Sequence, residues 1–152
     1  MKQWMMIVVA VLTLCSACTG RKVYAHYNPT SMIGWDRADQ LSFDVPAVKD
    51  SGLYATALGL RVNDFYPFTS LTLIVEQKIL PARQVRQDTL TFTLVDDKGS
   101  VKGQGVSTYQ YRLPVSTLAL HQGDSLHITV RHNMKQEILT GITDVGIEVT
   151  RR

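Results

Sequence analysis

Apolar and polar residues alternate with a period of two along most of the chain after residue 35. This period places successive side chains on opposite faces, which is the pattern of a β-strand and not of a helix. In residues 54–62, for example, Leu58 and Val62 share one face, while Arg61 and Asn63 lie on the other. The runs with this alternation are residues 41–45, 54–62, 71–75, 88–95, 107–113, 126–130 and 145–149.

Turn-forming residues separate these runs. Residues 49–52 and 96–99 each combine charged residues with a glycine, and Gly123 lies between a Gln and an Asp. Short strands with turns roughly every 8–15 residues, and no long helical pattern, are typical of β-sandwiches. We therefore predict an all-β fold, an antiparallel two-sheet sandwich that is jelly-roll-like and has about eight strands.

A few segments leave the local structure open. Residues 116–121 could form a single helical turn, and residues 133–138 could form a short helical segment. An edge strand is expected at residues 23–27. Trp35 is interpreted as a plug in the core or at its rim, in preference to a ligand platform. The predicted core consists of Phe43, Leu58, Leu60, Leu73, Leu90, Phe92, Leu94, Ile128, Val130, Val145 and Ile147.

The first residues of the chain have the pattern of a bacterial lipoprotein signal. Lys2 provides a positive charge, residues 5–14 form an apolar run, and Ala17 precedes Cys18. This apolar run is too short for a membrane span, which needs roughly 18 residues or more, but suits a signal peptide. We expect cleavage after Ala17 and lipidation of Cys18. The alternative is an ordinary secreted protein that is cleaved nearby and keeps Cys18 as a free thiol.

These boundaries divide the chain into three parts: a signal peptide with its lipobox at residues 1–17, a lipid-anchored tether at residues 18–34, and a single β-sandwich domain at residues 35–152. The chain from residue 18 onward is long enough to bury a core without disulfides. It has 15 basic and 13 acidic residues, because Lys2 is the only charged residue before Cys18. A net charge of +2 that is scattered along the chain gives no basis for nucleic-acid binding.

The densest polar cluster lies between His121 and His132. A catalytic reading would pair Ser125 with Asp124 and His127, but the sequence around Ser125 lacks a strand-to-helix elbow and reads as a hairpin turn. His127 and His132 lie five residues apart on a predicted strand and so face opposite ways, which excludes a shared metal site between them. Exposed strand histidines are the preferred interpretation.

No other motif points to catalysis. Phosphate-loop and dinucleotide-binding fingerprints are absent from the sequence, and Glu76 and Glu148 lie on the outward phase of their strands. We expect no catalytic residue, no cofactor and no metal ligand. Aromatic residues at Trp35, Phe65, Tyr66 and Phe68 could line a sugar-binding face, although packing is the preferred interpretation of such a corner.

A series of residues along the mature chain carries a family resemblance. In chain order they are Trp35, Leu60-Arg61-Val62-Asn63, Tyr66-Pro67-Phe68, Leu71, Asp88-Thr89-Leu90, Gly99, Gly103, Gly105, Gly123, Met134, Leu139-Thr140-Gly141-Ile142 and Asp144-Val145-Gly146-Ile147. With these residues the chain resembles the gliding-motility lipoprotein GldH family of the Bacteroidetes over nearly all of its mature length. One departure is Ser70, because the family often has Asn before the following Leu.

This resemblance implies a non-enzymatic envelope lipoprotein, an accessory or structural component associated with gliding motility and its linked secretion machinery. Its partners would be the membrane, through the anchor on Cys18, and other envelope proteins of a motility or secretion assembly. The surface expected to contact a partner contains Arg61 and Asn63 beside the aromatic corner of Tyr66 and Phe68. A structural Arg–Asp pair at Arg61 is the alternative use of that residue.

A surface carbohydrate-binding lipoprotein module is the alternative function. We expect an outer-membrane lipoprotein that faces the periplasm, for two reasons. No Asp follows Cys18 directly, and residues 19–23 lack the acidic run that tends to mark surface export in Bacteroidetes. The positive charges of Arg21 and Lys22 suit contact with anionic headgroups.

Overall fold

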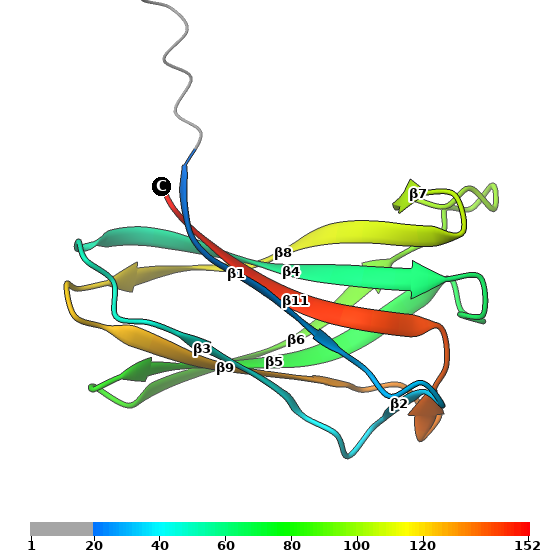
Figure 1. Cartoon of the computed structure of the whole chain (residues 1–152), viewed down its shortest axis with the longest axis horizontal. Coiled ribbons are helices and arrows are strands. Elements are labelled where there is room, and N and C mark those ends of the chain that lie inside the picture. The colour runs from blue at the N-terminus through cyan, green and yellow to red at the C-terminus, as the bar shows by residue number, and fades with distance from the viewer. Residues whose placement is uncertain (1–19) are drawn as a thin grey trace, which may run out of the picture.

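A computed structural model describes residues 20–152, and these residues form two β-sheets that pack face to face (Figure 1). The predicted signal peptide and Cys18 lie outside the described residues. Within residues 20–152 there is no helix long and apolar enough to cross a bilayer. The strands are β1 (Arg21–Pro29), β2 (Trp35–Asp36), β3 (Leu41–Val45), β4 (Gly52–Asn63), β5 (Ser70–Leu80), β6 (Gln84–Thr93), β7 (Gln104–Gly105), β8 (Thr108–Leu120), β9 (Ser125–His132), β10 (Ile138–Leu139) and β11 (Ile142–Arg151).

The strand order confirms the predicted fold class. The first sheet has the order β1-β11-β4-β8-β7 and the second has the order β3-β9-β5-β6, while β2 and β10 form a small separate pair. Every strand pairing is antiparallel. The eight long strands alternate between the sheets except at the β5–β6 hairpin, which is the two-Greek-key connectivity of a jelly roll.

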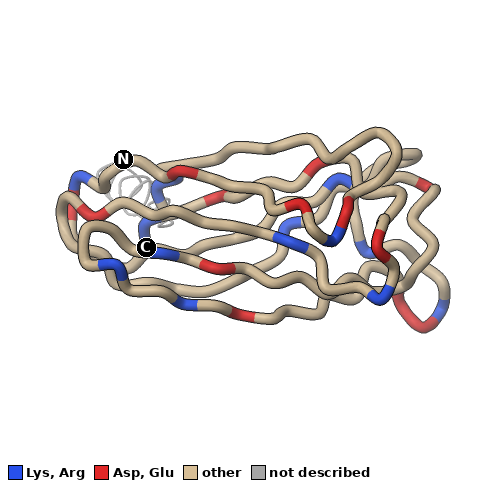
Figure 2. Tube along the Cα trace, turned by 90° about the horizontal axis from the view of Figure 1, so that it is seen from below, with Lys and Arg blue, Asp and Glu red and all other residues tan. Residues whose placement is uncertain are grey.

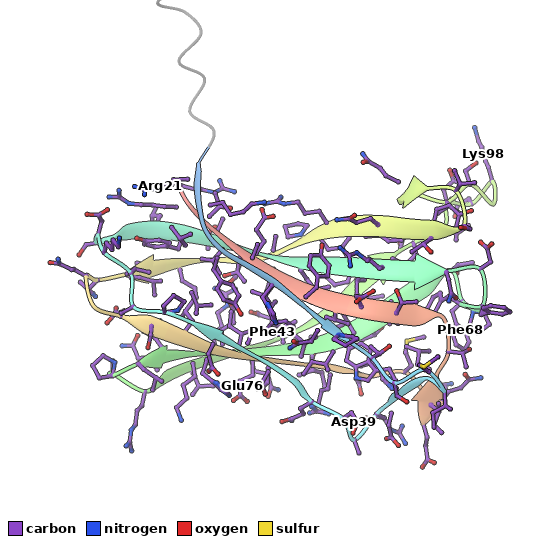
Figure 3. The ribbon with its side chains drawn as sticks, viewed as in Figure 1. Arg21, Asp39, Phe43, Phe68, Glu76 and Lys98 are labelled. Carbon is purple, nitrogen blue, oxygen red and sulfur yellow. The ribbon has the colours of Figure 1, made fainter. Side chains whose placement is uncertain are left out.

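The predicted alternation sets which side chains fill the space between the sheets. In β4, Leu58 and Leu60 are fully buried, and the partner strand β11 contributes Val145 and Ile147. In the second sheet, β9 buries alternate residues from Leu126 to His132. Figure 3 shows Phe43 pointing between the two layers. Because each strand has one apolar face, a slip of one residue in any pairing would turn that face to solvent.

The sheet begins earlier than the predicted domain boundary at residue 35. Strand β1 pairs with β11 from Arg21 opposite Arg151 to Pro29 opposite Asp144, so most of the segment assigned to a tether belongs to the sandwich. The edge strand expected at residues 23–27 is therefore present and longer than predicted. Tyr24 packs against the core from this strand, which gives β1 an inward face.

Strand β8 corrects the expected helical turn at residues 116–121. It continues from Thr108 to Leu120, and a bulge shifts its register against β4 around Pro114. Proline cannot donate to a ladder, so bulges and sheet edges are where it is tolerated. Residues 133–138 also contain no helix, and they form bends that lead into β10.

The predicted burial is wrong for two residues expected in the core and for one histidine expected to be exposed. Leu90 and Phe92 are only partly buried, because β6 is the outer strand of its sheet. His132 is fully buried, whereas His127 on the same strand is partly exposed. The two histidines do face opposite ways, as their spacing predicts. The other predicted core residues are buried.

Candidate functional site

Three connecting segments meet at the end of the sandwich that lies away from Arg21. They are residues 30–34, residues 64–69 between β4 and β5, and residues 140–141 between β10 and β11. Figure 3 shows this arrangement, with Phe68 labelled at one end and Arg21 near the start of β1. The three segments are brought together because β1, β4 and β11 are neighbours in one sheet.

The aromatic corner between β4 and β5 is held by its own side chains. The Tyr66 hydroxyl donates a hydrogen bond to the Ser70 carbonyl at 2.6 Å. Phe68 packs edge-on against Tyr66, with 5.7 Å between ring centroids. Both rings are partly buried against the core, and burial raises the pKa of Tyr66. Because Ser70 contributes its backbone carbonyl here, the departure from Asn at this position leaves the contact intact.

Asn63 and Gly141 dock this corner onto the neighbouring connection. Asn63 Oδ1 accepts a hydrogen bond from the Phe65 amide at 3.0 Å, and the Asn63 amide donates to the Gly141 carbonyl at 2.8 Å. Gly141 has a φ of +87°, and a Cβ there would collide with the backbone of Tyr66. Glycine is therefore required both by conformation and by space.

Several apolar side chains at this end point to solvent. Two of them, Met32 and Phe65, line a hollow of about 620 Å³. Phe65 is 79% exposed and Ile33 is 78% exposed, which is unusual for side chains of this size in a protein that buries its core well. We call this group the apolar rim; it consists of Met32, Ile33, Phe65 and Ile138.

Arg61 lies on the outer face of the first sheet, where its side chain contacts two other residues of the domain. Its guanidinium carbon lies 4.4 Å from the centroid of the Tyr27 ring, and its Nη1 lies 3.9 Å from Asp144 Oδ2. The structural Arg–Asp pair considered from the sequence is therefore present. Tyr27 itself lies across Gly59 and Gly146, where any Cβ would meet its ring.

The four residues predicted as a partner surface thus have different environments. Arg61 packs on Tyr27, Asn63 holds a turn, and Tyr66 and Phe68 are partly buried. All four lie at or near the end that carries the apolar rim. Sequence reasoning singled out Phe65 only as part of the aromatic corner, and it missed Met32, Ile33 and Ile138. The available signal was the adjacent pair Met32-Ile33 inside a segment of polar and turn-forming residues.

Trp35 is a core residue, as the sequence analysis preferred. It is 1% exposed, and its Nε1 donates to the Asp39 carbonyl at 3.1 Å. Its ring packs edge-on against His132 at 5.3 Å. His132 Nε2 lies 3.0 Å from the Trp35 carbonyl, and its Nδ1 accepts a hydrogen bond from the Met134 amide at 3.4 Å. Burial lowers the pKa of His132, which favours the neutral ring that these two contacts require.

The polar cluster around Ser125 is arranged as a turn. Asp124 Oδ2 accepts a hydrogen bond from the His121 amide at 2.8 Å, so this carboxylate closes the hairpin. His127 Nδ1 lies 2.6 Å from Asp44 Oδ1, on the solvent side of the second sheet. Within residues 20–152, no group of three or more His, Cys, Asp or Glu residues is placed to hold a metal ion.

Charged side chains of both signs are spread over the molecule, and some of them form ion pairs. Figure 2 shows Lys and Arg interspersed with Asp and Glu along the whole trace. Glu148, for example, bonds both Lys22 at 2.9 Å and Arg112 at 2.8 Å. Burial alone would raise the pKa of Glu148, but these two cations outweigh it and hold the pKa below its usual value.

Comparison with known proteins finds one family and two full-length relatives. A family model described as GldH lipoprotein matches residues 22–149. The chain is 28% identical to the Gliding motility lipoprotein GldH of Flavobacterium johnsoniae, covering 96% of this chain and 95% of that protein. It is 24% identical to the Gliding motility lipoprotein GldH homolog of Christiangramia forsetii, covering 95% and 93%.

Among solved structures, the comparison also finds a likeness to the mosquito-larvicidal Cry4Aa toxin of Bacillus thuringiensis. It aligns with a TM-score of 0.45 and 8% sequence identity, over 77% of this chain and 18% of that chain.

Proposed function

The chain belongs to the GldH lipoprotein family, and from that premise we propose that it is an envelope lipoprotein associated with gliding motility and its linked secretion machinery. The printed name of the Flavobacterium johnsoniae relative, which is aligned over nearly its full length, supports the motility role. We further propose that the role is accessory or structural and not enzymatic. The turn geometry around Asp124, which uses its carboxylate to close a hairpin, supports this reading.

The apolar rim is the observation that carries the proposed contact with another envelope protein. Contiguous exposed apolar side chains mark protein contact sites, and aromatic and Met side chains are enriched in them. Phe65 and Met32 line a hollow whose other walls are polar, including Asn63, Thr140 and Asp144. An apolar centre with a polar border is the usual anatomy of such a contact. We propose that the rim is the centre of the partner surface predicted beside Arg61 and Phe68.

The anchor belongs to the opposite end of β1. We propose that Cys18 is acylated and holds the protein at the outer membrane, with the domain in the periplasm. Strand β1 spans nine residues, so the rim lies about 30 Å along the strand from Arg21. Arg21, Lys22, Lys49 and Arg151 line a second hollow near the anchored end, where Lys22 pairs with Glu148 and Arg151 pairs with Asp50. The charges of Arg21 and Lys49 suit anionic headgroups, at about 1 kcal/mol for each basic residue close to the surface.

The contact is tested by purifying the native lipoprotein from membranes in mild detergent and identifying the proteins that accompany it. Phe65→Ser and Ile33→Ser should remove a specific companion while the yield of the lipoprotein stays the same. Leu53→Ser is the matched control, since Leu53 is exposed but lies outside the rim. If both rim variants retain every companion found with the native chain, the rim is not the contact.

The orientation is tested by adding protease to intact cells. A periplasmic domain should survive together with soluble periplasmic controls and be digested only after the outer membrane is opened. Digestion in intact cells would place the domain on the cell surface and favour carbohydrate binding. That alternative receives little support from Trp35, which is buried and offers no open aromatic platform.

A further inference from the structure

The two sheets have four outer edges, and three of them carry features that block pairing with another strand. Strand β1 has a bulge near Lys22 and ends at Pro29. Strand β3 is five residues long, and its Ser42 carbonyl accepts a hydrogen bond from Asn28 Nδ2 at 2.9 Å. Strand β8 has a bulge at Pro114 and is partly covered by β7. Bulges, prolines, short strands and covering segments are the usual protection of sheet edges.

The fourth edge, β6, has none of these features. Its ten residues pair with β5 in one unbroken register and include no proline. The described residues form no strand on its other side. Val85, Gln87, Thr89, Thr91 and Thr93 are all exposed on the outer face of the sheet. A long, regular and exposed edge is a template for adding another strand.

The hydrogen-bond pattern shows which backbone groups of β6 face outward. The Leu94 amide donates to the Thr69 carbonyl, and the Asn133 amide donates to the Thr72 carbonyl. Bonded pairs alternate along an antiparallel ladder, so odd-numbered residues of β5 bond to β6 and even-numbered ones bond to β9. The backbone groups of the odd-numbered β6 residues, including Gln87 and Thr89, therefore point away from the sheet.

The charges on β6 favour one register with a second copy. Arg86 Nε lies 2.8 Å from Asp88 Oδ2, and both side chains lie on the inner face of the strand. In a twofold antiparallel pairing centred on Gln87, Arg86 lies opposite Asp88 of the second copy. Centring the pair on Asp88 or Arg86 would instead place like charges directly opposite each other, which is unfavourable.

From this edge we propose that β6 pairs with β6 of a second copy of the chain, which joins the two second sheets into one continuous sheet. Gln87 lies on the twofold axis, and Val85 of each copy bonds to Thr89 of the other. Arg86 and Asp88 then form a non-hydrogen-bonded pair, where opposite side chains approach most closely. The axis runs perpendicular to the sheet, so both first sheets lie on the same side of the joined sheet, and the two β1 strands run in opposite directions. This proposal does not depend on the proposed function.

The test uses the full-length lipoprotein in its native envelope, with single cysteines introduced on β6. Under mild oxidation, Gln87→Cys should give a disulfide-linked species of twice the mass. Thr91→Cys is the matched control, because it has the same strand, face and exposure but lies about 26 Å from its copy in this register. We expect at least about tenfold more cross-linking at residue 87 than at residue 91, since a disulfide needs Cα atoms within about 7 Å. The wild-type chain gives the background from its own cysteines.

Charge reversal provides the second arm. In the Gln87→Cys chain, Asp88→Arg should reduce cross-linking by about tenfold because both cross-strand pairs become repulsive. Adding Arg86→Asp should restore it, because the swapped pair is again complementary. The comparison uses variants whose abundance and melting temperature equal those of the Gln87→Cys chain. The proposal is overturned if residues 87 and 91 cross-link equally, if Asp88→Arg has no effect, or if Gln87→Cys stays monomeric. A cross-link of Gln87→Cys to a different protein would also overturn it and assign the edge to a partner's strand.

Discussion

Gln77 on β5 donates a hydrogen bond from Nε2 to Ser116 Oγ on β8 at 2.8 Å, across the interior between the two sheets. Gln77 is fully buried, and the bulge at Pro114 sets the register that places Ser116 opposite Thr56 on β4. Gln77 Oε1 and Thr56 Oγ1 are buried without a hydrogen-bond partner among the described residues. The two sheets are thus joined by a polar contact inside a largely apolar core, as they also are where the Tyr111 hydroxyl on β8 donates to the Leu94 carbonyl at 3.0 Å.

We predict that Ser116→Ala lowers the free energy of unfolding by about 1–3 kcal/mol, because it leaves the buried Gln77 amide without an acceptor. Adding Gln77→Met removes the donor as well and should recover part of this loss. Denaturant unfolding of the two single variants and the double variant measures the coupling. Ser107→Ala, at an exposed serine, is the control and should have little effect. Additive losses would show that the two side chains do not interact.

Tyr27 and Gly146 form a second coupled pair, on the outer face of the first sheet. A Cβ at Gly146 would come 2.7 Å from the Tyr27 ring, so Gly146→Ala should displace that ring and cost about 1–3 kcal/mol. In a Tyr27→Ala chain the space is already open, and the same glycine change should cost much less. Thermal or denaturant unfolding of the four chains tests this. An equal cost in both backgrounds would mean that the ring does not cover the glycine.

Stability should fall as the solution is acidified below pH 6.5, because the pKa of buried His132 is lowered from its usual value of 6.5. The unfolded chain then binds a proton that the folded chain resists, so the free energy of unfolding decreases as pH falls through this range. Melting temperatures between pH 7.5 and pH 5 measure the slope. His132→Gln should flatten it, whereas His121→Asn should preserve it, since His121 is exposed. A slope that is the same in all three chains would assign the effect to other groups.

Cys18→Ala should abolish acylation and release the protein from the membrane fraction as a soluble or uncleaved form. A single acyl chain gives marginal binding, whereas two or more chains hold a protein stably. Fractionation and intact-mass measurement of the native protein check this. A mature chain that carries an unmodified Cys18 would contradict the prediction.

Local alternation was enough to predict most strands and their inward faces. Leu58 and Ile128, for example, are fully buried as their period-two positions require. Burial of Leu90 and Phe92 could not be predicted in this way, because it depends on which strand lies at the edge of a sheet. Leu73, on the neighbouring inner strand, is fully buried, so Leu73→Ala should destabilise the domain more than Phe92→Ala, against the expectation from the sequence.

The candidate site was harder to predict than the fold. Arg61 was correctly placed on an outward face, but its contact with Tyr27 joins residues far apart in sequence and depends on β1 lying beside β11. The apolar rim combines residues from two separate connections and from the short strand β10, so no single stretch of the sequence contains it. A jelly roll brings such connections together at its ends, so strand order had to be known before the rim could be recognised.

The pairing of β1 with β11 also determines how the domain would respond to mechanical force. The chain enters at Arg21, and the segment that follows Pro29 leads to the opposite end of the sandwich. A pull between the membrane and a partner bound at that far end would act nearly along the strands. The ladder bonds run across the strands, so this pull shears many of them at once, where a perpendicular pull would open them one after another. Under such a pull the β1–β11 ladder would be loaded in shear.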